Sequence, residues 1–477
     1  MRRGSAASLL GMVVALLVAS GAVWPAPPAS AGTVLRGIDD APLPTLPPNA
    51  RATHLHEIAG QLRAEVLRVD CQWPLAEPAR GQYSDSGYLG GVTATVEAAH
   101  ALGLKVIVSL DYVPKWASDA SYWDTFPAPG YAGYQQFYPM KPSALADYEA
   151  FAQHLSAELK GEVLGYEAYS EPNLWVHLFP QRTAGDPSFS AHAYLRYLKS
   201  FFAGVRAGDP GAKVIAGATA PTGQPAGSGN SYQTSPQSFA HALASAGAAA
   251  YFDVYSHHPY VPGGSGDMDP GLPPSNPSHT VSLSNIGTLL KIFPGKPFYL
   301  TEYGFSTEPS RAFAAPVTKV QQARWLSKAF ALAARHPRVK LLVWYLLQDT
   351  SPTGKPTSPD GWYLGLRRVG GTAKPAWYAF ARGNHISLAA PARAPRGARI
   401  VLSGSYASAS IGGVAGRRLL IERRKGAGRW RVVVAVRTGL RGRYSARVVL
   451  GATERWRVVF AGVVKSRLRL VVARRVS

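Results

Sequence analysis

The sequence predicts an α/β protein in which a (β/α)8 TIM barrel is followed by a small all-β sandwich domain. Up to about residue 385, runs rich in Val, Ile, Leu and Tyr alternate with helix-like amphipathic runs, a pattern typical of parallel strands that are buried on both faces. Two of the apolar runs end in a glutamate next to Pro, Asn or Gly, as expected of barrel strands that present chemistry at their C-terminal ends. Beyond residue 396 the pattern changes to short alternating runs with Gly-rich turns, which predicts antiparallel strands.

The first 31 residues predict a secretory signal peptide. Arg2 and Arg3 form a basic start, residues 9–23 are mostly apolar, and residues 29–31 are a small-residue cleavage site of the type Ala-Ser-Ala, the three parts that such signals share. The apolar run is short for a membrane-spanning helix; an uncleaved anchor is the alternative. We therefore expect a secreted protein, extracellular or associated with the cell surface, that has no transmembrane segment after removal of the signal.

The predicted catalytic barrel covers residues 32–386 and contains eight strands. Amphipathic helical patterns lie between the strands, for example over residues 147–155 and 320–334, as a closed barrel with inserted loops requires. A doubly wound open sheet is the alternative, but no Gly-rich nucleotide-binding loop follows any of the runs, which argues against it. The predicted strands are 34–39, 66–73, 105–112, 163–171, 213–219, 252–258, 297–302 and 340–347.

Long loops follow the third and the sixth predicted strands, and loops at these ends shape the active site of a barrel. Residues 260–281 are rich in Pro, Gly and Ser. The earlier loop is aromatic, and its rings can stack on sugar faces or pack the loop against the barrel; we expect both. Trp116 precedes it directly and is a candidate substrate contact. The aromatic residues of loop 117–142 are Tyr122, Trp123, Phe126, Tyr131, Tyr134, Phe137 and Tyr138.

The C-terminal part divides into a linker at residues 387–396 and a basic Ig-like β-sandwich at residues 397–477. Residues 391–477 carry 21 Lys or Arg and two Glu, and therefore 19 of the chain's 23 net positive charges. This charge gives no information about what the barrel binds. We expect arginines on the sandwich's solvent face to bind an anionic cell-wall polymer or glycan; a passive spacer, rich in arginine because of genome composition, is the alternative. Nucleic-acid binding is not expected, because no recognition motif is present.

The chain has a single cysteine, Cys71, so no disulfide can form within it and the fold must depend on its core. Cys71 lies in the second predicted strand without an activating pattern around it. We therefore predict a buried structural thiol.

The two glutamates that end strand-like runs carry the chemical prediction. Glu171 lies in residues 166–173 and Glu302 in residues 298–304. Hydrolysis of a glycoside with retention needs a carboxylic acid that protonates the leaving oxygen and a carboxylate nucleophile roughly 5 Å away, in surroundings that separate their pKa values. We assign Glu171 as the acid/base and Glu302 as the nucleophile, kept ionised by its neighbours, among them Arg68.

The ordered motifs over about residues 33–385 resemble a glycoside hydrolase of clan A, closest in style to family 39 and its family 5 relatives. The short motifs are weak signals singly, whereas their order along the strands is specific. They are Arg68 on the second strand, Ser170-Glu171-Pro172 on the fourth, His258-Pro259-Tyr260 on the sixth, Thr301-Glu302-Tyr303-Gly304 on the seventh, Trp344 on the eighth, and the closing Gly365-Leu366 and Lys374-Pro375-Ala376-Trp377-Tyr378.

The resemblance implies roles for these residues. Tyr260 would hydrogen-bond Glu302 with His258 nearby, Arg68 would orient Glu302, and Trp344 would form the floor of the sugar site. Each has a structural alternative: Arg68 can close an ion pair with Asp70 or Glu167, and the two aromatic residues can be ordinary packing. Two further candidate substrate contacts are Asp111, at the end of the third strand, and Asn173, two residues after Glu171.

One residue departs from the clan's pattern. The asparagine that normally precedes the acid/base, and that holds the sugar 2-hydroxyl in this clan, is Ser170 here. The interaction with the 2-hydroxyl strengthens in the transition state. Serine can act through a water, the substrate can differ at that carbon, or catalysis can be slow or absent.

We predict no metal and no cofactor. His257 and His258 are adjacent, and adjacent strand residues point to opposite faces, so they do not form a metal site together. Two functions remain: a secreted retaining glycoside hydrolase that acts on a polysaccharide or oligosaccharide, or a catalytically impaired barrel that binds glycans at the cell surface. The two glutamates favour the first, and Ser170 favours the second.

Overall fold

The computed structural model describes most of the chain. The predicted signal peptide, three aromatic residues of the first long loop (Phe126, Tyr131 and Tyr134) and residues 263–267 of the second lie outside the described residues. Within the described part, no helix is long and apolar enough to cross a membrane. The described residues are 34–124, 135–225, 232–262, 268–310, 313, 315–352, 361–381, 385–408, 412–413, 415–460 and 464–474.

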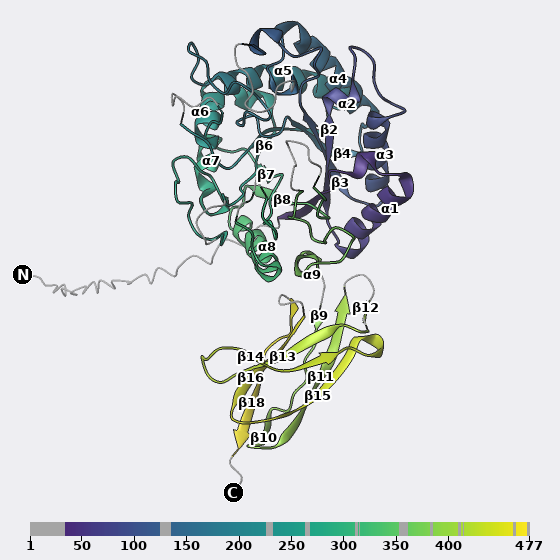
Figure 1. Cartoon of the computed structure of the whole chain (residues 1–477), viewed down its shortest axis with the longest axis vertical. Helices are drawn as coiled ribbons and strands as arrows, with labels where there is room; N and C mark the ends of the chain where they lie inside the picture. Colours follow the sequence, from purple (N-terminus) through teal and green to yellow (C-terminus); the bar gives the residue numbers. More distant parts are fainter. Residues whose placement is uncertain are drawn as a thin grey trace, which may run out of the picture. The chain divides into compact units, whose positions relative to one another are not determined.

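Eight parallel strands form a closed barrel, which confirms the predicted (β/α)8 fold. Each strand pairs with the next along the chain, and the eighth pairs with the first over Leu35–Asp39 and Leu341–Tyr345. Figure 1 shows the helices as a ring around these strands. The strands are β1 (Leu35–Asp39), β2 (Val66–Gln72), β3 (Lys105–Asp111), β4 (Val163–Ala168), β5 (Lys213–Thr219), β6 (Val254–His257), β7 (Phe298–Leu300) and β8 (Val339–Tyr345).

The helices of the barrel follow the strands in the order that the amphipathic patterns predict. Both predicted segments are confirmed, at residues 147–155 within α4 and at 320–334 as α8, which ends one residue earlier. The α-helices are α1 (Pro48–His56), α2 (Trp73–Ala76), α3 (Tyr88–Ala101), α4 (Leu145–Glu158), α5 (Phe189–Gly208), α6 (Pro236–Ser245), α7 (Gly287–Ile292), α8 (Lys319–Ala333) and α9 (Pro375–Phe380). Short helical turns are η1 (Leu43–Thr45), η2 (Glu57–Gln61), η3 (Ala120–Tyr122), η4 (Gln135–Phe137), η5 (Pro142–Ala144), η6 (Ala248–Tyr251), η7 (Leu283–Asn285) and η8 (Leu440–Gly442).

Strand β2 shows how the barrel places the site. Its side chains alternate, so that Val66 joins the small apolar cluster inside the barrel, whereas Leu67 and Val69 join the large cluster beneath the helices. Arg68, and then Asp70, follow Val66 on the inner face. The interior is therefore apolar at one end and polar at the C-terminal ends of the strands, the end at which barrels carry their active sites.

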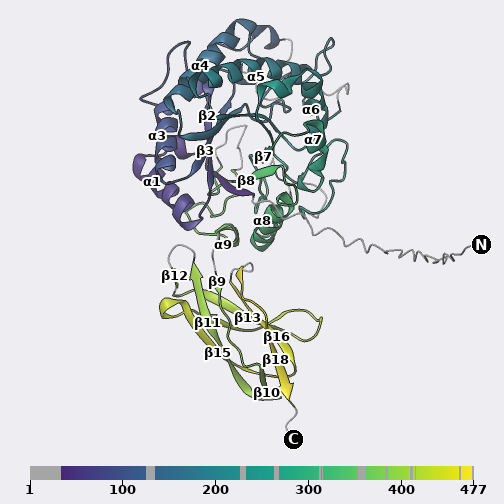
Figure 2. The ribbon, with the colours of Figure 1, turned by 180° about the vertical axis from the view of Figure 1, so that it is seen from behind.

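The C-terminal part forms two separate, largely antiparallel sheets, which confirms the predicted sandwich architecture (Figure 2). One sheet has the order β10-β18-β16-β13-β14 with β17 beside β16, and the other has the order β12-β11-β15 with β9 beside β11. Trp456, Ile421 and Leu402 lie in the core between them. The strands are β9 (His385–Ile386), β10 (Arg393–Pro395), β11 (Arg399–Ser408), β12 (Gly412–Gly413), β13 (Arg418–Arg424), β14 (Arg431–Arg437), β15 (Arg443–Val449), β16 (Glu454–Phe460), β17 (Val464–Lys465) and β18 (Arg469–Arg474).

The sandwich differs from the sequence prediction at its beginning. The alternating runs that predicted strands correspond to β13, β14, β15, β16 and β18, whereas the longest strand, β11, lacks such a run over its second half, which is rich in Ser and Gly. Residues 387–396, the predicted linker, contain β10, which pairs in parallel with β18. This segment therefore contributes backbone hydrogen bonds to a sheet.

Candidate functional site

Arg68 lies at the centre of a charged cluster inside the barrel. It is 1 % exposed, and its guanidinium reaches carboxylates from β1, β2 and β4 and from the segment that follows β7. Nη1 donates to Asp39 at 2.7 Å, Asp70 at 2.9 Å and Glu302 at 3.0 Å, while Nη2 donates to Glu167 at 2.9 Å. A buried guanidinium needs such partners, since an isolated buried charge is costly. Both interpretations of Arg68 hold: it contacts the candidate nucleophile and closes ion pairs within the barrel.

The carboxylates around Arg68 differ in how easily they ionise. Burial raises the pKa of Asp70 to about 6, with Arg68 opposing the shift. Burial, with the neighbouring Asp70, also raises the pKa of Asp39. Glu167 is buried too, but the charge of Arg68 outweighs that effect and its pKa is lowered. The charge of Arg68 therefore favours the ionised form of Glu167 most, whereas Asp39 and Asp70 are harder to ionise.

Glu302 follows β7 and is held at both carboxylate oxygens. Arg68 contacts Oε1, and the hydroxyl of Tyr260 donates to Oε2 at 3.0 Å. Burial, together with the charge of Glu302, raises the pKa of Tyr260 well above its ordinary value, so the phenol keeps its proton and remains a donor. The contacts implied for Arg68 and Tyr260 are therefore present, and they fix the orientation of this glutamate.

Glu171 follows β4 in a left-handed backbone conformation with φ of 42°. Its Oε1 accepts a hydrogen bond from His258 Nδ1 at 2.9 Å. The ring's other nitrogen is hydrogen-bonded to Thr301 Oγ1 at 3.1 Å, and Nδ1 also lies 3.7 Å from Glu302 Oε2. His258 therefore stands between the two candidate catalytic glutamates.

The protonation of this pair follows from its surroundings. Burial alone would raise the pKa of Glu171, but the hydrogen bond and charge of His258, followed by the charge of His177, outweigh it and lower the pKa. Burial would lower the pKa of His258, but Glu302 and Glu171 raise it. The pair accordingly favours an imidazolium beside a carboxylate in the free protein.

Glu171, His258 and Glu302 each bring one oxygen or nitrogen to within 4.8 Å of the others. Such a group can approach a metal ion, but both ring nitrogens of His258 already make hydrogen bonds. The absence of a metal stays a prediction. What the geometry supports directly is two carboxylates facing each other across a short gap.

Asp111 and Ser170 lie beside Glu171 as predicted. Asp111 Oδ1 accepts from the backbone N–H of Tyr112 at 2.8 Å and lies 3.5 Å from that of Ser170. Among the described residues, the Ser170 hydroxyl makes no hydrogen bond, and the residue is 6 % exposed. A short side chain therefore stands where a longer amide would reach further into the site.

Asn173 and Trp116 are held by the fold. Asn173 is fully buried, where its side chain donates to the carbonyls of Ala220 and Thr234 and accepts from the N–H of Ala220. The prediction that Asn173 contacts substrate is wrong, because its amide is saturated by the two ends of the loop between β5 and α6. Trp116 is partly buried and donates its indole N–H to the Glu77 carbonyl at 3.0 Å. The predicted contact with substrate can therefore be made only by the face of its ring.

The predicted floor of the sugar site, Trp344, faces away from the site. Side chains alternate along β8, so that Leu341 and Val343 lie inside the barrel and Trp344 packs fully buried in the outer core. Its indole N–H donates to the Leu364 carbonyl at 3.0 Å. The prediction is wrong by one residue: Tyr345 is the inward aromatic, and burial with the charges of Glu302 and Asp39 raises its pKa well above the ordinary value.

Sequence reasoning missed Asp39, Tyr345 and His177, and it considered Asp70 only as an ion-pair partner of Arg68, a contact that the structure confirms. Asp39 and Asp70 each stand at or near the end of an apolar strand, the same signal that identified Glu302, and Tyr345 follows from counting strand parity in β8. His177 had no periodic signal; it lies in the loop after Glu171. Its ring nitrogens lie 3.3 Å from Asp111 Oδ2 and 3.8 Å from Glu171 Oε2.

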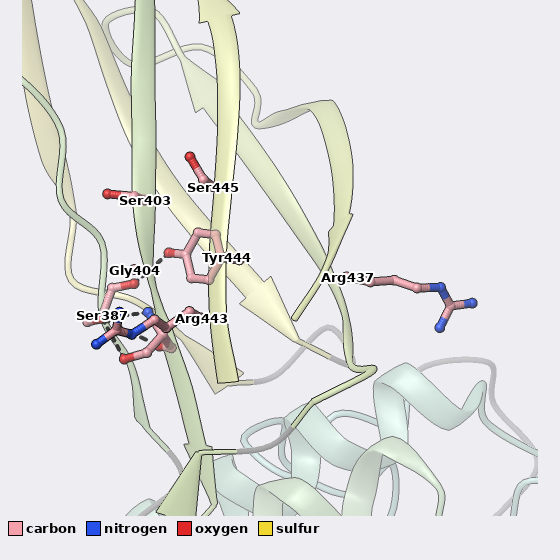
Figure 3. A pocket seen from close by; sticks show the side chains of 8 residues that line it. Ser387, Ser403, Gly404, Arg437, Arg443, Tyr444 and Ser445 are labelled. Atoms are coloured by element: carbon pink, nitrogen blue, oxygen red, sulfur yellow. Dashed lines mark hydrogen bonds between the residues drawn. The ribbon is translucent and has the colours of Figure 1, made fainter. Parts of the chain in front are cut away.

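The sandwich carries a separate hollow, shown in Figure 3. The Tyr444 hydroxyl in it donates to the Ser387 carbonyl, and Arg437 extends away from that group. No carboxylate or imidazole is among its lining residues, which excludes acid–base chemistry of the barrel's kind at this place. The lining residues are Ser387, Ser403, Gly404, Ser405, Arg437, Arg443, Tyr444 and Ser445.

The fold defines a class of barrel that is known from solved glycoside hydrolases. A family 39 glycoside hydrolase from the gut symbiont Bacteroides cellulosilyticus WH2 matches with a TM-score of 0.51 at 19 % identity, over 87 % of this chain and 80 % of its own. A GH5_18 protein from Streptomyces cattleya, in complex with Manβ1-4GlcNAc, matches with a TM-score of 0.53 at 16 % identity, over 73 % of this chain and 79 % of its own. A GH5_18 protein from Bifidobacterium longum subsp. infantis has a TM-score of 0.52 at 17 % identity, over 73 % and 77 %.

These likenesses confirm, at the level of the fold, the clan A resemblance that the motifs predicted. No known family model matches the sequence, and no curated protein matches it. The chemistry must therefore be argued from the side chains.

Proposed function

We propose that the protein is a secreted retaining glycoside hydrolase. The observation that carries the proposal is the pair Glu171 and Glu302, whose oxygens lie within 4.8 Å of each other at the C-terminal end of a closed parallel barrel. Carboxyl groups about 5 Å apart suit a nucleophile that reaches the sugar directly, whereas inverting enzymes need about 6.5–9.5 Å to admit a water.

In the proposed reaction Glu302 attacks the anomeric carbon while Glu171 protonates the departing glycosidic oxygen. The glycosidic bond breaks, and a bond forms between the sugar and Glu302. Water, deprotonated by Glu171, then attacks the anomeric carbon and releases the sugar from Glu302. Arg68 and Tyr260 hold Glu302 as a carboxylate, and His258 lies where it can share the proton that Glu171 donates.

The alternative is a barrel that binds glycans without cutting them. Ser170 favours it, because this residue cannot supply the longer amide that holds the sugar 2-hydroxyl in the clan that the chain resembles. The two functions are separated by asking whether bonds are cleaved.

The first experiment measures reducing-end release from a panel of neutral and acidic polysaccharides and oligosaccharides. Wild type is compared with Glu302→Gln and with Glu308→Gln, which changes an exposed glutamate outside the site. We expect wild type and Glu308→Gln to cleave one class and Glu302→Gln to lose at least about 1,000-fold in kcat while still binding that substrate. Retention is then read from the anomer first formed, by proton NMR. Equal glycan binding by all three without cleavage would instead establish the binding function.

Export is part of the proposal and rests on the signal-like residues 1–31. Mass spectrometry of the protein recovered from the medium tests it. A mature N-terminus at Gly32 supports cleavage after Ala31, whereas a membrane-bound chain that keeps Met1 supports an uncleaved anchor.

We also propose that the sandwich holds an anionic polymer, through a cluster defined here as Trp430, Arg424 and Arg457. The guanidinium carbon of Arg457 lies 4.1 Å from the ring centre of Trp430, and that of Arg424 lies 4.9 Å from it. Stacking on a ring fixes the guanidinium planes, and Arg457 in addition donates through Nε to Glu422 at 2.6 Å. The other guanidinium nitrogens of the pair are the donors proposed for carboxylate or sulfate groups. A spacer would need no such arrangement.

Binding of the full chain to polygalacturonate, measured at low and high salt, tests this second proposal. We expect Arg424→Gln/Arg457→Gln to weaken binding at least about tenfold at low salt. The double variant Arg335→Gln/Lys340→Gln removes two exposed charges from the barrel instead and should bind like wild type. Equal weakening by both would show that net charge alone is responsible, and no binding at low salt would remove the proposal.

A further inference from the structure

We propose that His177, oriented by Asp111, is a positioning residue for Glu171. Its imidazole is the second one, after that of His258, that lies beside the candidate acid/base carboxylate. The inference deepens the proposed hydrolase function and takes its catalytic meaning from it. It concerns a residue that belongs to none of the motifs that carry the resemblance.

The two oxygens of Glu171 face two different imidazoles. His258 Nδ1 lies 2.9 Å from Oε1, and His177 Nε2 lies 3.8 Å from Oε2. On its other side, His177 Nδ1 lies 3.3 Å from Asp111 Oδ2. Neither contact has hydrogen-bond geometry, since Nδ1 has no hydrogen-bond partner among the described residues and Nε2 lies 3.8 Å from its carboxylate. The two carboxylates therefore act on the ring through their charges, which attract it from both sides and favour its protonated form.

The backbone around His177 is fixed. Its ring stacks on Tyr112, with 5.4 Å between centroids and 7° between planes, and its carbonyl accepts from the Tyr169 hydroxyl at 2.7 Å. Tyr112, Tyr169 and Glu171 all have positive φ, at 64°, 70° and 42°. Non-glycine residues in this region cost of order 1–3 kcal/mol each, and such strain clusters at functional sites. The fold holds three strained residues around one histidine and its carboxylate.

The charges that face His177 favour the imidazolium. They come from Asp111 at the end of β3, Glu171 after β4 and Glu302 after β7, while Tyr112 covers the ring face. Burial would lower the pKa of His177, but these carboxylates, Asp111 first, raise it.

Glu171 in turn is faced by His258, by His177 and by the more distant Arg68. Glu302 lies across the gap and Tyr260 nearby. Removing the His177 charge therefore takes one of the three cations away from Glu171 and raises its pKa. Because the leaving oxygen is protonated by the acid form of Glu171, the alkaline limb of the kcat/KM profile should move to higher pH.

The test is His177→Gln in the full chain. Glutamine can place an amide N–H near the position of Nε2 but carries no charge. The Glu171 pKa is measured by carbon NMR of protein labelled at glutamate side-chain carboxyls, with Glu171→Gln assigning the signal. His192→Gln is the matched control, because His192 is paired with Asp186 at 2.7 Å, on α5 and outside the Glu171 cluster. Thermal unfolding verifies that each variant folds.

We expect His177→Gln to raise the Glu171 pKa by about 1 unit and His192→Gln to leave it in place. A folded His177→Gln protein with an unchanged Glu171 pKa would overturn the proposal. This readout needs no substrate, so it judges the role of His177 even if the protein cleaves nothing. If it is a hydrolase, the alkaline limb with an aryl glycoside should shift by the same amount, and an unshifted limb would also overturn the proposal.

Asp111→Asn provides a second, independent arm. Loss of this carboxylate should lower the pKa of His177 by about 1 unit, followed through the ring carbon signal that disappears in His177→Gln. An unmoved His177 pKa would show that Asp111 does not orient or charge the ring, and would overturn that part of the proposal.

Discussion

At the residue scale, Ser170 is the residue of the site that bears most directly on the proposed hydrolysis. Its hydroxyl makes no hydrogen bond to the described residues, and its backbone N–H faces Asp111. Hydrogen bonds to the sugar 2-hydroxyl strengthen as the reaction proceeds. A longer side chain with an amide at this position can reach a hydroxyl that serine reaches only through water.

Ser170→Asn should therefore raise kcat/KM at least about tenfold on a substrate with a free 2-hydroxyl, because the new donor acts mainly in the transition state. The measurement is steady-state hydrolysis beside Ser170→Ala, which tests whether the native hydroxyl contributes at all. If Ser170→Asn leaves kcat/KM unchanged or lowers it, the substrate does not place a hydroxyl there, and its chemistry at that carbon is unusual.

The neighbouring aromatics of β8 should separate function from stability. Tyr345→Ala is expected to lower kcat/KM about 30-fold, because the inward ring beside Glu302 is lost. Trp344→Phe is expected to keep kcat/KM and to lower the free energy of unfolding by about 1–3 kcal/mol, because a smaller ring fills the buried position and the Leu364 carbonyl keeps only one of its two donors, Gln322. The pair is compared by kinetics and urea denaturation. If Trp344→Phe instead lowers kcat/KM and Tyr345→Ala lowers only stability, Trp344 is the aromatic residue that contacts the sugar.

The residues that sequence predicted correctly share one property: each sits on or directly after a strand within an ordered motif. Glu171, Glu302, Arg68 and Tyr260 come together as expected. Asn173 was misjudged because only the three-dimensional structure shows that the loop between β5 and α6 saturates its amide. His177 lies in an irregular loop, and its approach to Glu171 depends on a loop path that no periodicity encodes.

At the element scale, the barrel is set by the two-residue period of its strands. Apolar, arginine and aspartate side chains succeed one another on the inner face of β2, and Ile107, Ser109 and Asp111 do so on β3. These two strands could be predicted from the sequence because buried parallel strands are nearly continuous apolar runs. β11 could not be, because its second half has the composition of a turn, and its strand conformation depends on pairing with β15.

The close approach of β4 to β5 gives an element-scale prediction. A Cβ at Gly165 would lie 2.5 Å from the backbone oxygen of Lys213, so a strand must shift to admit it. Gly165→Ala should lower the free energy of unfolding by about 1–3 kcal/mol, and it should reduce activity because Glu167, two residues on, holds Arg68. Gly60→Ala is the control, since nothing lies within 4 Å of its Cβ position. Equal urea midpoints for both would contradict the tight contact.

At the scale of the whole molecule, charge is divided between the two parts of the chain. Residues 391–477 carry 19 of the 23 net positive charges, almost all as arginine, and arginine stays charged at every pH at which proteins fold. The barrel holds carboxylates with shifted pKa values, the buried Asp39 and Glu167 and the partly buried Asp70. The dependence of folding on mildly acidic pH should therefore come from the barrel.

The pKa of Asp70 determines whether the free energy of unfolding rises or falls with pH. Its pKa is raised to about 6 in the folded protein, against about 3.9 in an unfolded chain. Below pH 4 both states are protonated and the group has no effect. As pH rises from 4 to 6 the unfolded state loses its proton first, so stability falls across that window and remains lower above it. For a shift of this size the fall is about 2–3 kcal/mol.

Asp70→Asn cannot ionise, so its free energy of unfolding should fall less between pH 4 and pH 7 than that of wild type, by about 2 kcal/mol. Urea denaturation at both pH values measures the difference, and hydrogen exchange of β1, β2 and β3 peptides verifies that the barrel is the part that responds. Because the comparison is between two pH values within each protein, the lost contact between Asp70 and Arg68 largely cancels. Asp85→Asn removes an exposed carboxylate and should behave like wild type. If Asp70→Asn loses stability as steeply as wild type, Asp70 is ionised throughout and Arg68 compensates its burial fully.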